Sequence, residues 1–119
     1  MGAPVGIAVA ASSGSVANAT AVATLPAATN RFTHLAGFDI TVGGATAGAL
    51  VNATVTGIVG GPATYVIAVP TGATLGTSLV LAFDPPLQGA AQNTAIVVTL
   101  PAVGAGSTAA CVNARGLIL

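Results

Sequence analysis

Few side chains in this chain could do acid–base, nucleophilic or metal chemistry. The 119 residues contain one histidine, one cysteine, two aspartates and two arginines, with no lysine and no glutamate. A metal centre with three or four protein ligands would need nearly all the ligands of one chain. Asp39 and Asp84, as a glycosidase pair, would need a cleft lined by aromatic residues, and tryptophan is absent. This inventory predicts no enzymatic activity, no cofactor and no metal site.

His34 and Cys111 are the two side chains that most invite a chemical interpretation. Alternation along the predicted strand places His34 on the inner face beside Phe32, near a strand end. We expect a hydrogen-bonded or half-exposed histidine, with a symmetric site shared among subunits as the alternative. Cys111 is the single cysteine, so it forms no intrachain disulfide, and we expect it to act as a small apolar residue in a strand.

The near-absence of charge indicates a surface that is covered by a partner. Only 3% of the residues are charged, whereas a soluble domain carries about a quarter. A neutral surface favours association, so we expect the chain to be part of an assembly. Two arginines cannot neutralise enough phosphates to hold nucleic acid. Gly, Pro, Thr or Asn interrupts every apolar run before it reaches the length of a membrane-spanning helix, so no membrane partner is expected.

The chain is predicted to be all-β. Segments rich in Val, Thr, Ile, Leu and Phe alternate with clusters of Gly, Pro, Asn and Ser, a pattern typical of a sandwich or barrel. Turns are expected at several Gly- and Pro-rich sites, including Asp84-Pro85-Pro86. The predicted strands cover residues 4–11, 15–25, 31–42, 49–58, 63–69, 77–84, 94–100 and 108–118.

Period-two alternation assigns side chains to an inner and an outer face. The third strand is expected to bury Phe32, Phe38, Ile40 and Val42 and to expose Arg31, Thr33, Asp39 and Thr41. The same rule places on the inner face the residues Leu79, Leu81, Phe83, Tyr65, Ile67, Val69, Ile96, Val98, Leu100, Val112 and Ile118. All four charged residues then lie outside the core.

Residues 1–119 are predicted to form one β-sandwich domain, because no linker divides the chain. Eight evenly spaced strands fit two four-stranded antiparallel sheets of the jelly-roll kind. The alternative is a seven-stranded immunoglobulin-like sandwich. In that case the first segment is free. The uncharged, glycine-interrupted residues 1–12 are suited to an extended N-terminal arm that reaches a neighbour, and the alternative is an ordinary edge strand.

An interface is predicted from the charged residues and from the apolar start of the chain. In a jelly roll the third strand lies between the eighth and the sixth, which would bring Arg31, Asp84 and Arg115 to one end of a sheet, with Asp39 towards the other. We expect a salt bridge between Arg31 and Asp84. Val5 and Ile7 in the first segment complete the predicted interface residues.

Several segments resemble small structural proteins of tailed bacteriophages. They are Leu35-Ala36-Gly37-Phe38-Asp39-Ile40-Thr41-Val42, Val55-Thr56-Gly57-Ile58-Val59-Gly60-Gly61, Val69-Pro70-Thr71-Gly72-Ala73, Thr94-Ala95-Ile96-Val97-Val98-Thr99-Leu100-Pro101 and Gly104-Ala105-Gly106. The resemblance covers roughly residues 25 to 119. It implies a capsid decoration, or cement, protein: a compact β-fold that sits on the head lattice, commonly as a homotrimer, and ties neighbouring major capsid subunits together.

The expected location is therefore the exterior of a virion. The first ten residues have no basic region of a signal peptide, so we expect synthesis in the host cytoplasm without export. The alternatives are another virion component, such as a head fibre base, tail or spike module, and a glycan-binding adhesin. The adhesin is disfavoured because only Tyr65 is available to stack on a sugar.

Overall fold

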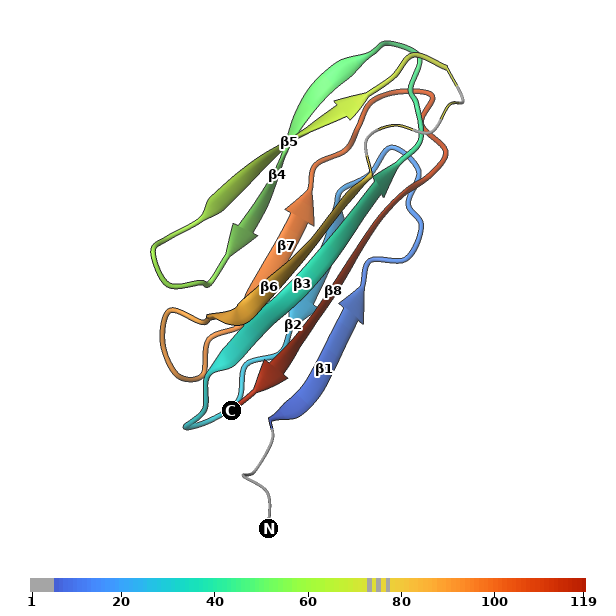
Figure 1. Cartoon of the computed structure of the whole chain (residues 1–119). Helices are drawn as coiled ribbons and strands as arrows, with labels where there is room; N and C mark the ends of the chain where they lie inside the picture. Colours follow the sequence, from blue (N-terminus) through green and yellow to red (C-terminus); the bar gives the residue numbers. More distant parts are fainter. Residues whose placement is uncertain (1–5, 73, 75, 77) are drawn as a thin grey trace.

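The computed structural model is all-β and describes residues 6–72, 74, 76 and 78–119. Figure 1 shows its strands in two layers. They are β1 (Ile7–Ser12), β2 (Ala21–Leu25), β3 (Thr33–Val42), β4 (Ala49–Thr56), β5 (Ala63–Val69), β6 (Leu79–Gln88), β7 (Ile96–Leu100) and β8 (Ala110–Ile118).

The strands form two antiparallel sheets in jelly-roll order. One sheet has the order β1-β8-β3-β6 and the other β2-β7-β4-β5. The chain crosses between the sheets at each step except the β4–β5 hairpin, as expected for a double Greek key. The eight-stranded sandwich is confirmed, including the position of β3 between β8 and β6.

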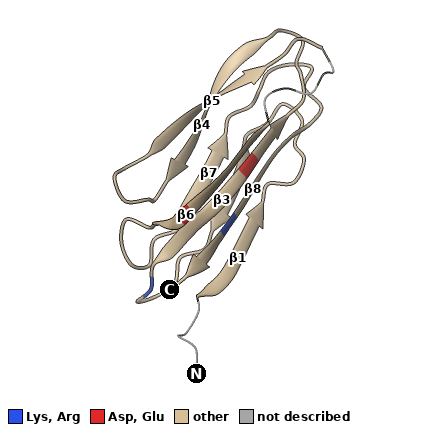
Figure 2. Ribbon diagram, in the orientation of Figure 1, with Lys and Arg blue, Asp and Glu red and all other residues tan. Residues whose placement is uncertain are grey.

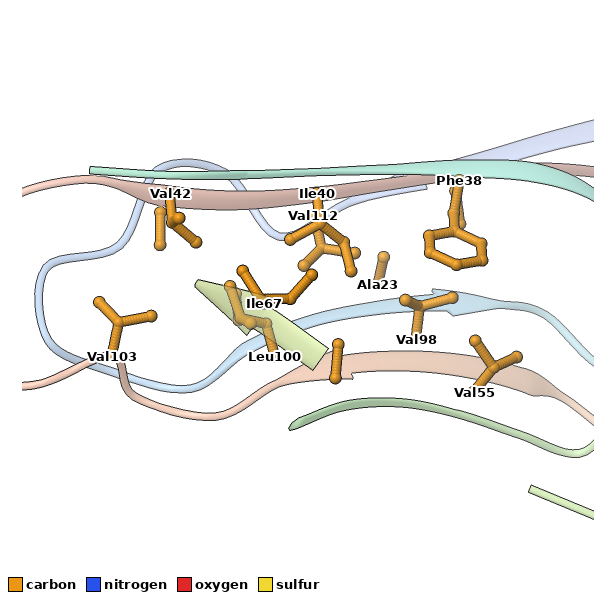
Figure 3. Close-up of a cluster of buried hydrophobic side chains, with 14 of the residues drawn as sticks. Ala23, Phe38, Ile40, Val42, Val55, Ile67, Val98, Leu100, Val103 and Val112 are labelled. Carbon is orange, nitrogen blue, oxygen red and sulfur yellow. The ribbon is translucent and has the colours of Figure 1, made fainter. Parts of the chain in front are cut away.

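The core lies between the sheets and consists of the inward-pointing, alternate residues of the strands (Figure 3). In β7, Ile96, Val98 and Leu100 have no exposed surface, while the intervening residues point outward. Pro101 directly follows β7 and has no N–H to donate, which explains why the ladder with β4 ends near it. The predicted inner faces of β5, β7 and β8 are confirmed.

A β-bulge divides β3 and reverses the predicted faces of its first half. The register with both β6 and β8 shifts between Leu35 and Gly37. Thr33, expected outside, is therefore fully buried and donates its hydroxyl hydrogen to the carbonyl of Pro26, 2.6 Å away. Phe32 and His34, expected inside, are only half-buried. Beyond the bulge, Phe38, Ile40 and Val42 point inward as predicted.

Two predicted boundaries are also wrong. β2 begins at Ala21 rather than at residue 15, because Asn18 takes a positive φ of 43° and turns the chain first. β6 continues through Pro85 and Pro86 to Gln88, where a turn was expected. Both prolines are tolerated because they lie in the bulged stretch of this edge strand, which has no one-to-one partner in β3, so neither missing N–H costs a ladder bond.

The first described residues form an edge strand. β1 pairs over its length with β8, from Ile7 opposite Ile118 to Ser12 opposite Asn113. The free-arm interpretation and the seven-stranded alternative therefore fail for residues 7–12. Residues 1–5, including the predicted interface residue Val5, lie outside the described part of the chain.

Candidate interaction surfaces

The charged residues lie on one sheet and on the connection that enters it (Figure 2). Asp39 is on β3, Asp84 on β6 and Arg115 on β8, and all three strands belong to the same sheet. Arg31 precedes β3. No charged residue occurs in β2, β7, β4 or β5, whose residues are all described. The two outer faces of the sandwich therefore differ in kind.

Asp39 and Arg115 form an ion pair with two hydrogen bonds. Arg115 Nη1 donates to Asp39 Oδ2 at 3.1 Å, and Arg115 Nη2 donates to Asp39 Oδ1 at 3.2 Å. The side chains are 45% and 30% exposed, respectively. Hydrogen bonding to Asp39, together with its negative charge, raises the pKa of the Arg115 guanidinium. Sequence reasoning missed this pair, because it had placed the two residues at opposite ends of the sheet.

Gly37 provides the space that this pair occupies. A Cβ atom at Gly37 would lie 3.3 Å from Arg115 Nη2 and 2.5 Å from the carbonyl oxygen of Leu81. The guanidinium thus crosses the strand where no side chain stands, beside the bulge. The Leu-Ala-Gly-Phe-Asp sequence of residues 35–39 contains this signal, since an isolated glycine in a strand often marks a bulge or a close approach.

The predicted salt bridge between Arg31 and Asp84 does not form; Asp39–Arg115 is the ion pair that occurs among the described residues. Four residues of β6, from Phe83 to Pro86, stand opposite the single Ala36 of β3. Asp84 lies in this irregular stretch and is exposed. The Arg31 carbonyl instead accepts a hydrogen bond from the N–H of Asn93, at 3.0 Å, before β3 begins. The predicted strand order is correct, but strand order does not determine the register between β3 and β6.

The outer face of the β2-β7-β4-β5 sheet is uncharged and rich in β-branched residues. In register, Val22 lies opposite Thr99, Thr99 opposite Thr54, and Thr54 opposite Thr64, so that one row crosses the four strands. A second row runs from Thr24 through Val97 to Thr56. We call these seven residues the threonine face.

Exposed apolar side chains border the threonine face on the β4–β5 hairpin. Leu50 is 73% exposed and Val66 is 61% exposed. Both belong to the outer side of their strands, because Ala53 and Ile67, of opposite parity, are buried. A neutral face with exposed Leu and Val at its border is suited to contact with another protein surface.

Ile7 lies at the start of β1 and is 57% exposed, although its strand partner Ile118 is buried. The predicted interface residues are thus dispersed. Arg31 lies in the β2–β3 connection, Asp84 on the β6 edge and Arg115 in mid-sheet. Among the described residues, no hydrogen bond or ion pair joins the side chains of these three residues to one another, and Ile7 pairs with Ile118 of β8.

The remaining candidates for chemistry are isolated from one another. His34 lies on the outer side of β3, and its Nδ1 is buried without a hydrogen-bond partner. Cys111 Sγ lies 3.9 Å from the hydroxyl oxygens of Ser12 and Ser13. Cys111 also lines a cavity of about 290 Å³ at the end of the sandwich, with Thr41 and Thr108.

The described residues contain no group of three or more His, Cys, Asp or Glu side chains that could hold a metal ion. Within the same residues, no helix is long and apolar enough to cross a membrane. No known protein family, curated protein or solved structure matches this chain.

Proposed function

We propose that this protein is a structural virion component that decorates and stabilises a bacteriophage capsid by bridging neighbouring major capsid subunits. The observation that carries this proposal is the uncharged outer face of the β2-β7-β4-β5 sheet, which contains the threonine face, on a chain that has only four charged residues. The sequence resemblance to small phage structural proteins supplies the biological setting. We further propose that the subunits associate as homotrimers.

Burial of a neutral surface is physically suited to this task. A protein that bridges lattice subunits makes many repeated contacts, and each must gain more from apolar burial than it loses by desolvating polar groups. Thr and Val bury methyl groups, and a neutral hydroxyl costs less to desolvate than a charged group. The exposed Leu50 and Val66 add apolar area. Contacts of this kind are insensitive to salt, unlike contacts built from charge pairs.

A glycan-binding role is less well supported. Tyr65 packs against Phe38 with ring centroids 5.3 Å apart in an edge-on arrangement, on the core side of β5. A stacking platform for a sugar would need an aromatic face turned to solvent. Another virion position, such as a head fibre base, tail or spike module, uses the same surface and remains the alternative proposal.

Binding of purified protein to heads that lack it tests the proposed function. We expect saturation at a fixed copy number per major capsid subunit, with affinity nearly unchanged between low and high salt. Thr56→Lys on the threonine face should reduce attachment, while Val80→Lys on the other sheet, where Val80 is 65% exposed, should not. Failure of the unmodified protein to bind heads, tails or spikes would reject a virion role.

Sedimentation of the isolated protein tests the proposed homotrimer. At low protein concentration the expected particle has three times the mass of the 11.1 kDa chain, and its association should persist in high salt because neutral surfaces form the contact. A monomer at all concentrations would contradict self-association.

A further inference from the structure

The two side margins of the sandwich differ in how well they close. β1 and β2 lie in contact at one margin, whereas β5 and β6 stand further apart at the other (Figure 1). Large side chains fill the wider margin, and Tyr65 and Phe83 remain only partly buried there. The hydrophobic core thus reaches the surface beside the β5 edge.

An aromatic row crosses this margin and ends at the β5 edge. Phe38 is fully buried on β3 and lies between two partly buried rings. Its ring centroid is 5.3 Å from that of Tyr65 on β5 and 6.1 Å from that of Phe83 on β6. Tyr65 is the outermost member of the row towards the edge of its sheet.

The two edge strands at this margin are protected unequally against pairing with another chain. β6 carries Asp84, Pro85 and Pro86 and has an irregular register, and these features prevent edge-to-edge pairing. β5 has no charge, proline or glycine between Ala63 and Val69. Gly76 lies near the Ala68 carbonyl at the end of β5, so the part of this edge that a second strand can reach runs from Ala63 to Ile67.

We propose that residues 63–67 of two copies of this chain pair as antiparallel strands about a two-fold axis at Tyr65. The pairing would join two β2-β7-β4-β5 sheets into one continuous sheet. This edge is suited to pair with another β-strand, because the edge backbone presents a row of N–H and C=O groups. The partner strand would come from a second copy of the chain, because residues 63–67 are complementary to themselves in an antiparallel pair.

The self-complementarity follows from the register of the pair. Tyr65 would face Tyr65 of the second copy, extending the aromatic row across the axis. On the same face the small Ala63 would lie opposite Ile67, and on the outer face Thr64 would lie opposite Val66. β-Branched and aromatic cross-strand pairs without like charges are favourable. The pairing also covers part of Val66, which is otherwise 61% exposed.

This contact goes beyond the proposed function. A two-fold contact is isologous, whereas the contact within a trimer is heterologous. The β5 pair would therefore link chains of neighbouring trimers, and it can be tested on isolated protein without any capsid. Its failure would leave the head-binding experiment unaffected.

Oxidative coupling of tyrosine tests the proposal directly, because Tyr65 is the only tyrosine in the chain. A photoactivated ruthenium complex with persulfate removes one electron from each phenol, each phenol loses a proton, and the two rings form a carbon–carbon bond while persulfate is reduced. In a Cys111→Ser background, we expect covalent dimers with dityrosine fluorescence. Tyr65→Phe is the negative control, because it leaves no tyrosine to couple.

Two matched variants locate the contact. Val66 and Val80 both point outward from edge strands, one in each sheet, and are 61% and 65% exposed. Val66→Lys should reduce dityrosine yield at least tenfold, and Val80→Lys should leave it unchanged, with both variants melting like the parent. Equal loss in both variants would overturn the proposal, as would a parent that associates by light scattering without forming dityrosine, or that stays monomeric.

Disulfide trapping tests the register and does not depend on lysine variants. In the Cys111→Ser background, Thr64→Cys and Val66→Cys would be opposite one another, with Cβ atoms about 4.5–5.5 Å apart. Two copies of either variant alone would be diagonal neighbours about 7–8 Å apart, which is too far for a relaxed disulfide. We expect the mixture to oxidise to heterodimers. Homodimers in equal or greater yield, or no disulfide-linked dimer at all, would overturn the Tyr65 axis.

Discussion

Arg115 and Asp39 are 76 residues apart in sequence, yet they form an ion pair with two hydrogen bonds at the centre of one sheet. In register, Arg115 lies opposite Gly37 and Asp39 lies opposite Asn113, so the pair is diagonal. The guanidinium reaches Asp39 over the strand at Gly37. A glycine and a bulge thus determine which charges meet.

Removing the Asp39 charge should have a small effect on folding. Asp39→Asn loses an exposed ion pair, and such pairs contribute little because water and salt screen them. We expect a slightly lower urea midpoint at low salt and a smaller difference at high salt. Asp84→Asn is the control, since Asp84 is exposed and makes no ion pair in the described part of the chain. An equal loss of stability in both variants would indicate a general effect of charge and not a contribution of the Asp39–Arg115 pair.

Gly37→Ala should be much more destabilising. The new methyl group would lie 2.5 Å from the Leu81 carbonyl oxygen, which is backbone and cannot rotate away. We expect a loss of about 3 kcal/mol in the free energy of unfolding, typical of overpacking. Gly60→Ala, at φ 93° with no atom within 4 Å of the new group, should cost about 1 kcal/mol through backbone strain alone. Chemical denaturation measures both, and a smaller loss at Gly37 would show that β6 shifts easily.

The buried hydroxyl of Thr33 should contribute through its hydrogen bond to Pro26. Thr33→Val keeps the shape of the side chain but removes the donor, leaving the carbonyl of Pro26 without that partner. The expected cost is about 1–2 kcal/mol. Thr33→Ser retains the donor and loses only a methyl group, worth about 1 kcal/mol. Thermal melts of the two variants would separate the contribution of the hydrogen bond from that of the methyl group. A Thr33→Val variant as stable as the parent would show that the hydrogen bond contributes no net stability.

Deleting residues 1–12 should lower the melting temperature. The deletion removes β1, so β8 loses its partner from Asn113 to Ile118 and becomes an edge strand. Val9 and Ala11, which pack against the core, are lost as well. Calorimetry checks the expected shift. An unchanged melting temperature would mean that β1 contributes no net stability.

Alternation of side chains was sufficient to predict the architecture but not all of the faces. Ile96, Val98 and Leu100 are inward as expected, because β7 is regular over its full length. The first half of β3 was wrong because the bulge beside Gly37 adds a residue that period-two counting cannot register. His34 and Thr33 exchanged faces for this reason.

The charged pair could not be predicted because it depends on register rather than on strand order. The order β8-β3-β6 was correct, but the four β6 residues opposite Ala36 displace Asp84 from the position that simple pairing assigns. Proline also misled the prediction of β6, since Pro85 and Pro86 occur within an edge strand where their missing N–H groups cost no ladder bond. The interface roles of Arg31, Asp84, Arg115 and Ile7 stay predictions.

The confinement of charge to one sheet gives the molecule two sides that respond to different physical variables. Contacts made by the side with Asp39, Asp84 and Arg115 weaken as ionic strength rises. Contacts made by the threonine face depend on apolar burial and weaken on cooling. Cooling, and not added salt, would therefore release the neighbours that the threonine face holds.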